Sequence, residues 1–439
     1  MKKYFNLITV TLIGLSLIYS CNKDEMETNE GNADDTIEND TIVNDTTVND
    51  TIISDTTATD TTTQDNALNS SDYHVIRAGL KNCYIKFKKD KKGRVAFLGG
   101  SITQRDGWRD SMHVYFENRF PETLFDFVDA GIGSMGTTSG AFRLERDVLK
   151  DGPVDLIFVE AAVNDRAIKR TSAEQIDGME GIFRHILDSD PATDIINMHF
   201  VDKPKMADYR KGNIPEVIIN HENVSEHYNV STINLAKEVT DRIDNQEFTW
   251  EDDFLNLHPS PFGHEVYARS MRQMLDNVFS GYSDSEETIV DHIIPEKIST
   301  QCYDKGYLIE AATIAPATGW FVDPLWKPTD GAKTRENYVD VPMLICESLD
   351  NIQTFDFEGK AVGIAIAQGP DAATIEYRID LGSWIKLNLD PNNKVHLPSY
   401  HTLAIGLDMT SHNLEIKIVN DPEKASSACR IRYFYVNSH

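Results

Sequence analysis

The feature that most constrains the fold of this chain is a regular alternation of apolar runs and amphipathic segments between Arg94 and Phe279. The runs RVAFLGG from Arg94 and VDLIFVEAA from Val154 have the length and composition of buried strands. RDSMHVYFENRF from Arg109 and EQIDGMEGIFRHILD from Glu174 have helical periodicity. Strands and helices that alternate in this way predict an α/β fold, a parallel sheet covered by helices on both faces.

The remaining elements expected in this region, in chain order, are TLFDFVDA, SGAFRLERDVLK, DIINMHFV, a helix near Val217 to Tyr228, STINLA, and a last helix from His264 to about Phe279. In open parallel sheets, ligands bind beyond the carboxyl ends of the strands. Ser101, Gly133 and Asn164 each follow a predicted strand. We therefore expect these three residues to lie along one edge of the sheet.

Beyond about Ser283 the hydrophobic pattern changes to a period of two. ATIEYRID would point Ile375, Tyr377 and Ile379 inward, HNLEIKIV would do the same with Leu414, Ile416 and Ile418, and RIRYFYV is a third such run. Gly, Pro, Asn and Asp separate the runs, which is typical of an all-β antiparallel sandwich. We therefore predict an α/β domain over residues 73–283 and a sandwich domain over residues 284–439.

The N-terminus has the pattern of a secretory signal peptide over residues 1–20. Lys2 and Lys3 precede an apolar segment from Phe5 to Tyr19. The ending LIYSC resembles a bacterial lipobox, which implies cleavage before Cys21 and lipidation of its thiol. The acidic run that follows resembles the surface-export signal of Bacteroidetes lipoproteins. Together these resemblances imply an outer-membrane lipoprotein exposed at the cell surface.

Residues 21–72 have the composition of an extended, disordered tether. They hold fourteen acidic residues and one lysine, and an aspartate recurs every fifth residue from Asp35 to Asp65. Such a segment cannot bury enough apolar surface to fold. Its DTI and DTT triplets resemble a Bacteroidetes O-glycosylation site, which implies glycans on Thr36, Thr41, Thr46, Thr51, Thr56 and Thr61. The alternative is a low-complexity spacer made by repeat expansion.

The charge and the cysteines restrict the possible partners. The formal net charge is −28 and no cluster of Lys and Arg is visible, which argues against binding to nucleic acid. Cys83, Cys302, Cys346 and Cys429 are widely spaced without a CxxC pattern, which argues against a metal site. In an oxidising compartment they could form one or two disulfides or remain buried thiols.

The sequence AFLGGSITQ places a serine where a buried strand ends. Gly99 and Gly100 permit a tight turn that would expose the Ser101 hydroxyl as a nucleophile. Taken alone, Ser101 is better explained as a helix N-cap. Two further segments, DAGIGSMGTTSG from Asp129 and VEAAVND from Val159, would bring backbone N–H groups and the Asn164 amide to the same edge. Such donors stabilise an oxyanion.

A fourth segment, NLHPSPFGHEVYA from Asn256, supplies a base. His258 precedes Pro259, where helix is disfavoured, so its ring should be held on a loop. His264 should start the last helix and face solvent or the protein interior.

These four segments, in this order, resemble the SGNH hydrolases, also called the GDSL esterase and lipase superfamily. The resemblance covers roughly residues 90–280, with GGSIT, DAGIGS, AVND and LNLHP as its four blocks. It implies a flavodoxin-like three-layer α/β/α sheet with Ser101 as nucleophile and His258 as general base. Asn164 and the backbone N–H groups of Ser134 and Ser101 would form the oxyanion hole.

One departure concerns the acid that normally stands three residues before the histidine, where this chain has Leu255. A leucine cannot accept the imidazole N–H, and an accepting group holds the productive tautomer. Asp253 could curl in, Asn256 could bond neutrally, or a backbone carbonyl could serve in a Ser-His dyad.

The C-terminal region resembles the jelly-roll sandwich that accompanies several carbohydrate-active SGNH esterases. It would contact sugar or only pack against the catalytic domain. Trp320, Trp326 and Trp384 are candidate sugar-stacking platforms, although burial in a core is the commoner fate of tryptophan.

We therefore expect a surface esterase that removes acyl groups, most plausibly acetyl, from a polysaccharide, with no metal or cofactor required. The alternatives are a non-catalytic glycan-binding protein on a degenerate hydrolase scaffold and a lipase or lysophospholipase.

Overall fold

The computed structural model describes residues 68–283, 285, 287–389, 394–422 and 427–438, all within one compact unit, Thr61–His439. The predicted signal peptide, the lipidation site Cys21, the tether up to residue 67 and the six candidate glycosylated threonines lie outside the described residues. Residues 68–72, the last five of the predicted tether, are described and contact the α/β part. The Leu68 N–H donates to Glu247, and the Ser70 hydroxyl donates to Glu238. Among the described helices, none combines the length and the apolar character needed to cross a membrane.

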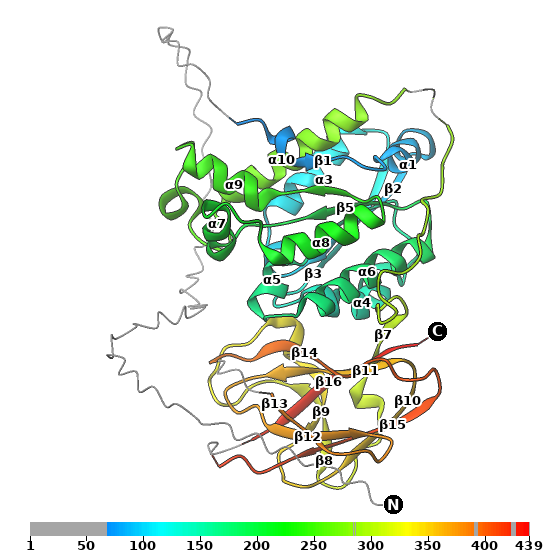
Figure 1. Cartoon of the computed structure of the whole chain (residues 1–439), viewed down its shortest axis with the longest axis vertical. Helices are drawn as coiled ribbons and strands as arrows, with labels where there is room; N and C mark the ends of the chain where they lie inside the picture. Colours follow the sequence, from blue (N-terminus) through cyan, green and yellow to red (C-terminus); the bar gives the residue numbers. More distant parts are fainter. Residues whose placement is uncertain (1–67, 284, 286, 390–393, 423–426, 439) are drawn as a thin grey trace, which may run out of the picture. The chain divides into compact units, whose positions relative to one another are not determined.

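The first part of the chain is built on a six-stranded sheet of order β1-β6-β5-β4-β2-β3 (Figure 1). Its strands are β1 (His74–Val75), β2 (Lys92–Gly99), β3 (Leu124–Gly131), β4 (Leu156–Glu160), β5 (Asp194–Met198) and β6 (Ser231–Ile233). All pairs are parallel except β1 with β6. The parallel strands, β3-β2-β4-β5-β6, have the flavodoxin-like order. The predicted fold is thus confirmed, with one short antiparallel edge strand added.

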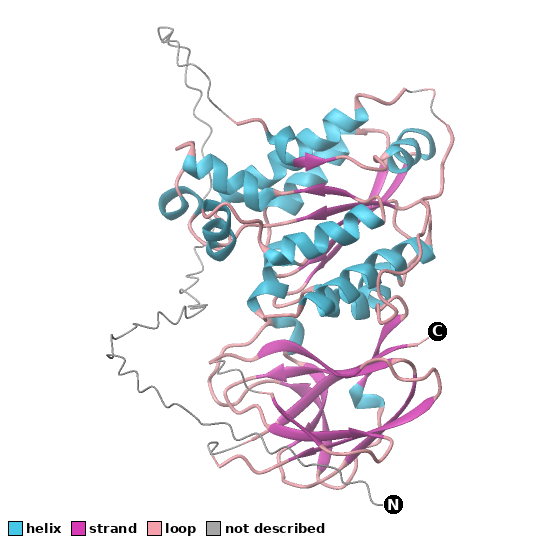
Figure 2. Ribbon diagram, viewed as in Figure 1, coloured by secondary structure: helices cyan, strands magenta, loops and turns pink. Residues whose placement is uncertain are grey.

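Helices lie on both faces of this sheet (Figures 1 and 2). Helices α3, α9 and α10 lie on one face, and α4, α6 and α8 lie on the other. The helices are α1 (Lys81–Ile85), α2 (Ser101–Gln104), α3 (Trp108–Arg119), α4 (Thr137–Leu144), α5 (Ala162–Ala167), α6 (Ser172–Ser189), α7 (Lys203–Arg210), α8 (Glu216–His227), α9 (Leu235–Asp244) and α10 (Pro261–Phe279). Short 3₁₀ or π turns are η1 (Ser70–Tyr73), η2 (Lys86–Asp90), η3 (Glu145–Leu149) and η4 (Trp250–Phe254).

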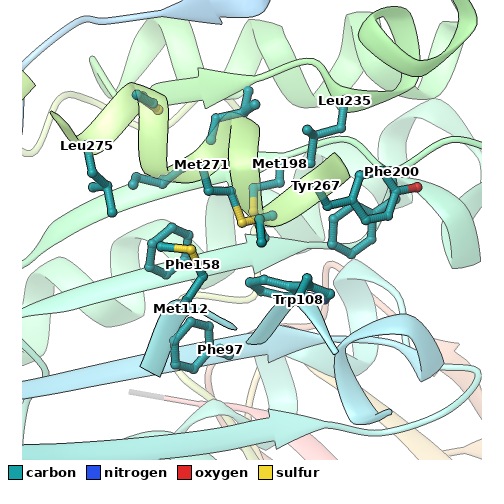
Figure 3. Close-up of a cluster of buried hydrophobic side chains, with 14 of the residues drawn as sticks. Phe97, Trp108, Met112, Phe158, Met198, Phe200, Leu235, Tyr267, Met271 and Leu275 are labelled. Atoms are coloured by element: carbon teal, nitrogen blue, oxygen red, sulfur yellow. The ribbon is translucent and has the colours of Figure 1, made fainter. Parts of the chain in front are cut away.

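The continuous apolar runs of β2 and β4 are explained by burial on both faces. Successive side chains of a strand point to opposite faces, so Phe97 and Phe158 belong to one core while Leu98 and Val159 belong to the other. The Phe97 and Phe158 rings stack with their centroids 5.3 Å apart, beside Trp108 of α3 (Figure 3). A parallel sheet covered on both sides requires such runs.

The last helix, α10, begins earlier than expected. We predicted a start at His264, but α10 begins at Pro261. The Ser260 hydroxyl accepts the Gly263 N–H at 3.1 Å, and Pro261 occupies the first turn, where its missing N–H costs nothing. His264 therefore lies within the first turn of the helix.

The second part of the chain consists of two antiparallel sheets. One has the order β10-β15-β12-β13 and the other β14-β11-β16-β9-β8, with β7 also paired to β16. The strands are β7 (Gly306–Glu310), β8 (Trp320–Trp326), β9 (Val341–Cys346), β10 (Gln353–Glu358), β11 (Ala361–Gln368), β12 (Thr374–Ile379), β13 (Ile385–Asn388), β14 (Leu397–Ala404), β15 (Ser411–Ile418) and β16 (Cys429–Asn437). Two short 3₁₀ turns are η5 (Ala311–Thr313) and η6 (Glu336–Tyr338).

Side chains from both sheets meet in one core. All six residues predicted to point inward, three from β12 and three from β15, belong to it or pack against it. The antiparallel β prediction is therefore confirmed. Cys83, Cys302, Cys346 and Cys429 are buried free thiols, so the structure contains none of the disulfides considered above.

A separate core joins the two parts of the chain. Phe142 of α4 contacts Tyr303 and Tyr435, with ring centroids 4.8 and 4.4 Å apart. These residues belong to a cluster that also contains Leu98 of β2 and Ile345 of β9. The β sheets are thus packed against the α4 face of the parallel sheet through buried aromatic side chains.

Candidate active site

The carboxyl ends of β4, β2 and β3 lie side by side, which brings the first three predicted motif segments together. Gly99 at the end of β2 pairs with Gly131 at the end of β3, and Leu98 pairs with Val159 of β4. The buried Arg143 of α4 donates to the carbonyl oxygens of Gly99 and Ala130 at 3.0 and 2.8 Å. This guanidinium holds the ends of β2 and β3 together. The site lies where strand order reverses, between β2 and β4, as expected for this topology.

Ser101 is the first residue of α2, and Gly100 is the N-cap. The Ser101 side chain does not cap the helix. Its Oγ lies 2.7 Å from Nε2 of His258, which is within hydrogen-bond distance. When Nε2 is unprotonated the hydroxyl donates to it, the arrangement needed for a base to remove its proton. Two residues 157 positions apart in the chain are thus brought together.

His258 lies on the loop between η4 and α10, as its position before Pro259 predicts. The Asn256 side-chain oxygen accepts the backbone N–H of His258 at 2.8 Å. Oδ2 of Asp253 accepts the backbone N–H of Thr249 at 2.7 Å and its hydroxyl at 3.0 Å. That carboxylate therefore stabilises the start of η4. The role of Asp253 as the third member of a catalytic triad stays a prediction.

His264 is held away from Ser101 by the interior of the protein. It is 6% exposed, and its Nδ1 accepts the Trp108 N–H at 3.3 Å. Burial, together with the neighbouring Arg105, lowers the pKa of His264 to about 4. The ring packs under Gly107, where a Cβ would lie 2.4 Å from it. This supports the expectation of a packing role.

The predicted oxyanion donors show two unusual features. A Cβ on Gly100 would lie 2.0 Å from Nδ2 of Asn164, so the Asn164 amide approaches this backbone as only glycine allows. Ser134 has φ = 68°, a left-handed conformation that residues other than glycine rarely adopt. The chain therefore accepts strain to orient the peptide at Ser134.

The three predicted donors have no acceptor within the described part of the chain. This holds for the N–H groups of Ser101 and Ser134 and for the side-chain amide of Asn164. Two neighbouring N–H groups are paired: the Gly133 N–H donates to Gln104 at 2.7 Å, and the Asp165 N–H donates to Ala161 at 3.0 Å. The three donors that the family resemblance assigns to the oxyanion hole are thus available to donate to a ligand oxygen.

Asp165, the last residue of the AVND motif, has contacts that the motif alone did not predict. This fully buried carboxylate accepts the Thr137 N–H at 2.9 Å, the Thr137 hydroxyl at 2.8 Å and the His221 Nε2–H at 3.0 Å. A Cβ on Gly136 would lie 2.1 Å from it. Asp165 therefore fastens the loop that carries Ser134 to the turn that carries Asn164.

A second buried carboxyl, Glu160, ends β4 just before Asn164. One of its oxygens accepts the Val163 N–H at 3.1 Å. Burial raises the pKa of Glu160 to about 7, although Lys205 acts in the opposite direction. This group also could not be assigned from sequence, because a glutamate at a strand end is usually exposed.

One group of possible metal ligands occurs among the described residues, in the β part. Asp330, Asp371 and His396 place their ligand atoms within 4.8 Å of one another. Arg430 already donates to both oxygens of Asp371, and His396 pairs with Asp330 at 2.9 Å. Each of the three side chains thus already has a partner, while Nδ1 of His396 is buried without a hydrogen bond among the described residues.

The candidate sugar platforms are mostly interior. Trp320 and Trp326 are each 5% exposed, and Nε1 of Trp320 donates to the Asn351 carbonyl. Trp384 is partly buried, with the charged groups of Arg378 and Lys417 at 4.4 and 4.8 Å from its ring. These surroundings favour packing over sugar stacking.

Residues 97–266 match the model of the GDSL-like Lipase/Acylhydrolase family. This part of the chain is therefore similar to GDSL-like lipases and acylhydrolases. This segment contains Ser101, Ser134, Asn164 and His258, so the family match covers the whole candidate site. Among curated proteins, none matches the chain.

Most of the chain is similar to solved structures of a two-domain esterase (CEX) active on acetylated mannans. One was co-crystallised with mannopentaose. For both structures the sequence identity is 18%, the TM-score is 0.66, and the match covers 84% of this chain and 98% of the other. The domain is also similar to a catalytic mutant of Axe2, an acetylxylan esterase from Geobacillus stearothermophilus, at 16% identity, with 44% and 96% of the chains covered and a TM-score of 0.35. The first comparison confirms that the acylhydrolase fold and the β sheets form a known two-part architecture.

The close approach at Gly100 can be tested by Gly100→Ala. Its φ of −90° suits alanine, so the main effect is displacement of the Asn164 amide. We expect kcat for p-nitrophenyl acetate to fall roughly 100-fold, the cost of one oxyanion donor, with little change in KM. Gly281→Ala, where the nearest atom is 3.4 Å away, is the matched control. Equal kcat in both variants would contradict this function of Gly100.

The raised pKa of Glu160 predicts a pH-dependent effect on stability. The folded protein holds this proton up to about pH 7, whereas the unfolded chain releases it near the usual 4.5. The group therefore weakens folding progressively as pH rises between these values. At each pH the Glu160→Gln variant is compared with wild type. The gain in stability from this substitution should be larger at pH 8 than at pH 5, by about a few kcal/mol at most.

Urea unfolding at the two pH values measures this difference. Glu117→Gln, on the exposed side of α3, is the control for the loss of one negative charge. An identical stability difference at pH 5 and pH 8 for Glu160→Gln would be inconsistent with a titrating buried carboxyl.

Proposed function

We propose that this chain is a serine esterase that removes acyl groups, in particular acetyl groups, from a polysaccharide. The observation that carries the proposal is the 2.7 Å contact between Ser101 Oγ and His258 Nε2 at the end of β2. It stands beside three N–H groups that have no acceptor among the described residues. A nucleophile, a base and unpaired donors at one strand edge are the groups that acyl transfer requires.

In the first half of the proposed reaction, Ser101 Oγ attacks the ester carbonyl carbon while His258 Nε2 takes the hydroxyl proton. The carbonyl oxygen becomes an oxyanion that accepts from the Ser101 N–H, the Ser134 N–H and the Asn164 amide. The imidazolium then gives its proton to the departing sugar oxygen. The carbon–oxygen bond to the sugar breaks, and the acyl group remains on Ser101.

In the second half, water attacks the acyl-serine and gives its proton to His258. The same three donors stabilise the second tetrahedral intermediate. Its collapse returns the proton to Ser101 Oγ and releases the free acid. The cycle needs a group that orients His258, for which Asp253, Asn256 and a backbone carbonyl remain the candidates.

The proposal of a polysaccharide substrate is supported by the similarity to the two-domain esterase, which is active on acetylated mannans. The predicted export signal and tether also suit an extended extracellular substrate. Acetylated mannan is therefore the first substrate to test, followed by acetylated xylan and pectin.

The proposed cell-surface location rests on the sequence of residues 1–72. If Cys21 carries the lipid anchor, Cys21→Ser should move the protein from the membrane fraction to the soluble fraction in cells that export it. Protease treatment of intact cells tests exposure. Membrane association that is unchanged in this variant would contradict anchoring at Cys21, and the Ser101→Ala variant serves as a control with the N-terminus intact.

Ser101→Ala tests the catalytic proposal. Removing the nucleophile should lower acetate release from acetylated mannan by roughly a thousandfold or more, because the remaining groups cannot form an acyl-enzyme. His258→Ala should produce a similar loss. Ser280→Ala, at an exposed serine that follows the end of α10, is the matched serine control.

The possible outcomes separate the proposals. Unchanged acetate release in Ser101→Ala would overturn the proposal of an esterase. The absence of acetate release from any acylated glycan, by wild type and by Ser101→Ala, would also overturn it. Glycan affinity that persists without turnover would favour the binding protein. Turnover confined to long-chain esters would show that the substrate is a lipid and not a polysaccharide.

A further inference from the structure

Gln104 connects the loop that carries Ser134 to the β part of the chain. It is the last residue of α2, three positions after Ser101. Its side-chain oxygen accepts the Gly133 N–H at 2.7 Å. Its amide donates to Oδ1 of Asn337 at 3.0 Å, and Asn337 belongs to η6, between β8 and β9. One side chain thus spans the oxyanion loop and the second part of the chain.

The loop at Ser134 needs such a restraint. A left-handed serine costs free energy and persists only where its surroundings impose it. Ser134 has this conformation, and the preceding Gly133 has no side chain to limit its rotation. The bond from the Gly133 N–H to Gln104 fixes the peptide adjacent to the one that presents the Ser134 N–H. A Cβ on Gly133 would lie 3.3 Å from the same Gln104 oxygen.

Asn337 contacts the end of the Gln104 amide that faces away from the loop. A glutamine amide can rotate by half a turn, which exchanges its oxygen and nitrogen. Only the oxygen can accept the Gly133 N–H. Because Asn337 presents its own oxygen to the other end, it favours the orientation with the Gln104 nitrogen toward itself. The neighbouring Tyr338 is buried in the core that includes Ile132, so η6 has a firm attachment beside the loop.

We propose that Gln104 is a positioning residue for the Ser134 oxyanion donor and that Asn337 acts through Gln104. In this way the β part of the chain raises the rate of the acyl-transfer step without contacting the reacting atoms. The inference rests on the proposed esterase function. It concerns the alignment of a donor, so it predicts an effect on kcat rather than on substrate affinity.

The test compares variants of the full chain with acetylated mannan and p-nitrophenyl acetate. Gln104→Met keeps the length of the side chain but removes the acceptor, and we expect kcat to fall about tenfold with KM unchanged within a factor of two. Gln104→Glu retains an acceptor for the Gly133 N–H and should restore most of kcat. Asn337→Ala should lower kcat by about threefold.

The double variant decides whether Asn337 acts through Gln104. If it does, Gln104→Met with Asn337→Ala should be no slower than Gln104→Met alone, because the path is already broken. Lys305→Ala is the control. It removes a 2.8 Å ion pair between the β part and Asp188 of α6, far along the chain from the oxyanion loop, and should leave kcat unchanged.

Multiplicative losses in the double variant, or a rise in KM with kcat unchanged, would overturn the inference. A lower melting temperature with wild-type kcat in Gln104→Met would also overturn it, since the role would then be structural. Asn337 is exposed, so its variant keeps the test valid if Gln104→Met folds poorly. If Ser101→Ala turns over like wild type, the proposed function fails. If Ser101→Ala is inactive and Gln104→Met matches wild type, only this inference fails.

Discussion

The buried carboxylate of Asp165 is the interaction on which the candidate site depends. A charge removed from water must find donors in the protein, and Asp165 finds them on Thr137 and His221. These partners come from the segment after β3 and from α8. Satisfying one buried charge therefore locks the two loops that supply the Ser134 and Asn164 donors. Without it, correct strands would still leave their loops free to move apart.

Glycines around Asp165 and Asn164 make this arrangement sterically possible. Gly100 and Gly136 lie where a Cβ would collide with the Asn164 amide and the Asp165 carboxylate. Their value here comes from close approach and not from unusual backbone angles. Ser134 is the opposite case, because it adopts a left-handed conformation without being glycine. The site thus combines close packing at Gly100 and Gly136 with a strained backbone conformation at Ser134.

The β part of the chain contributes through a shared core and through hydrogen bonds. Phe142 packs between Tyr303 and Tyr435, and the amide of Gln104 reaches Asn337. The first contact stabilises the α4 face of the sheet, and the second ends beside Ser134. Trp320 belongs to the core between the two β sheets, whereas Trp326 belongs to the core that joins the two parts.

The sequence by itself determined the fold class and predicted the members of the candidate site. Strand and helix periodicity is a local property, and the ends of parallel strands must share an edge, so Ser101 and Asn164 could be placed at one edge before any coordinates. Pro259 likewise predicted a loop for His258. Only the tertiary structure decided that Asp253 binds Thr249, that His264 is buried, and that Asp165, Glu160 and Gln104 support the donors. Those roles depend on which distant groups burial brings within hydrogen-bond distance, and spacing along one chain carries no record of that.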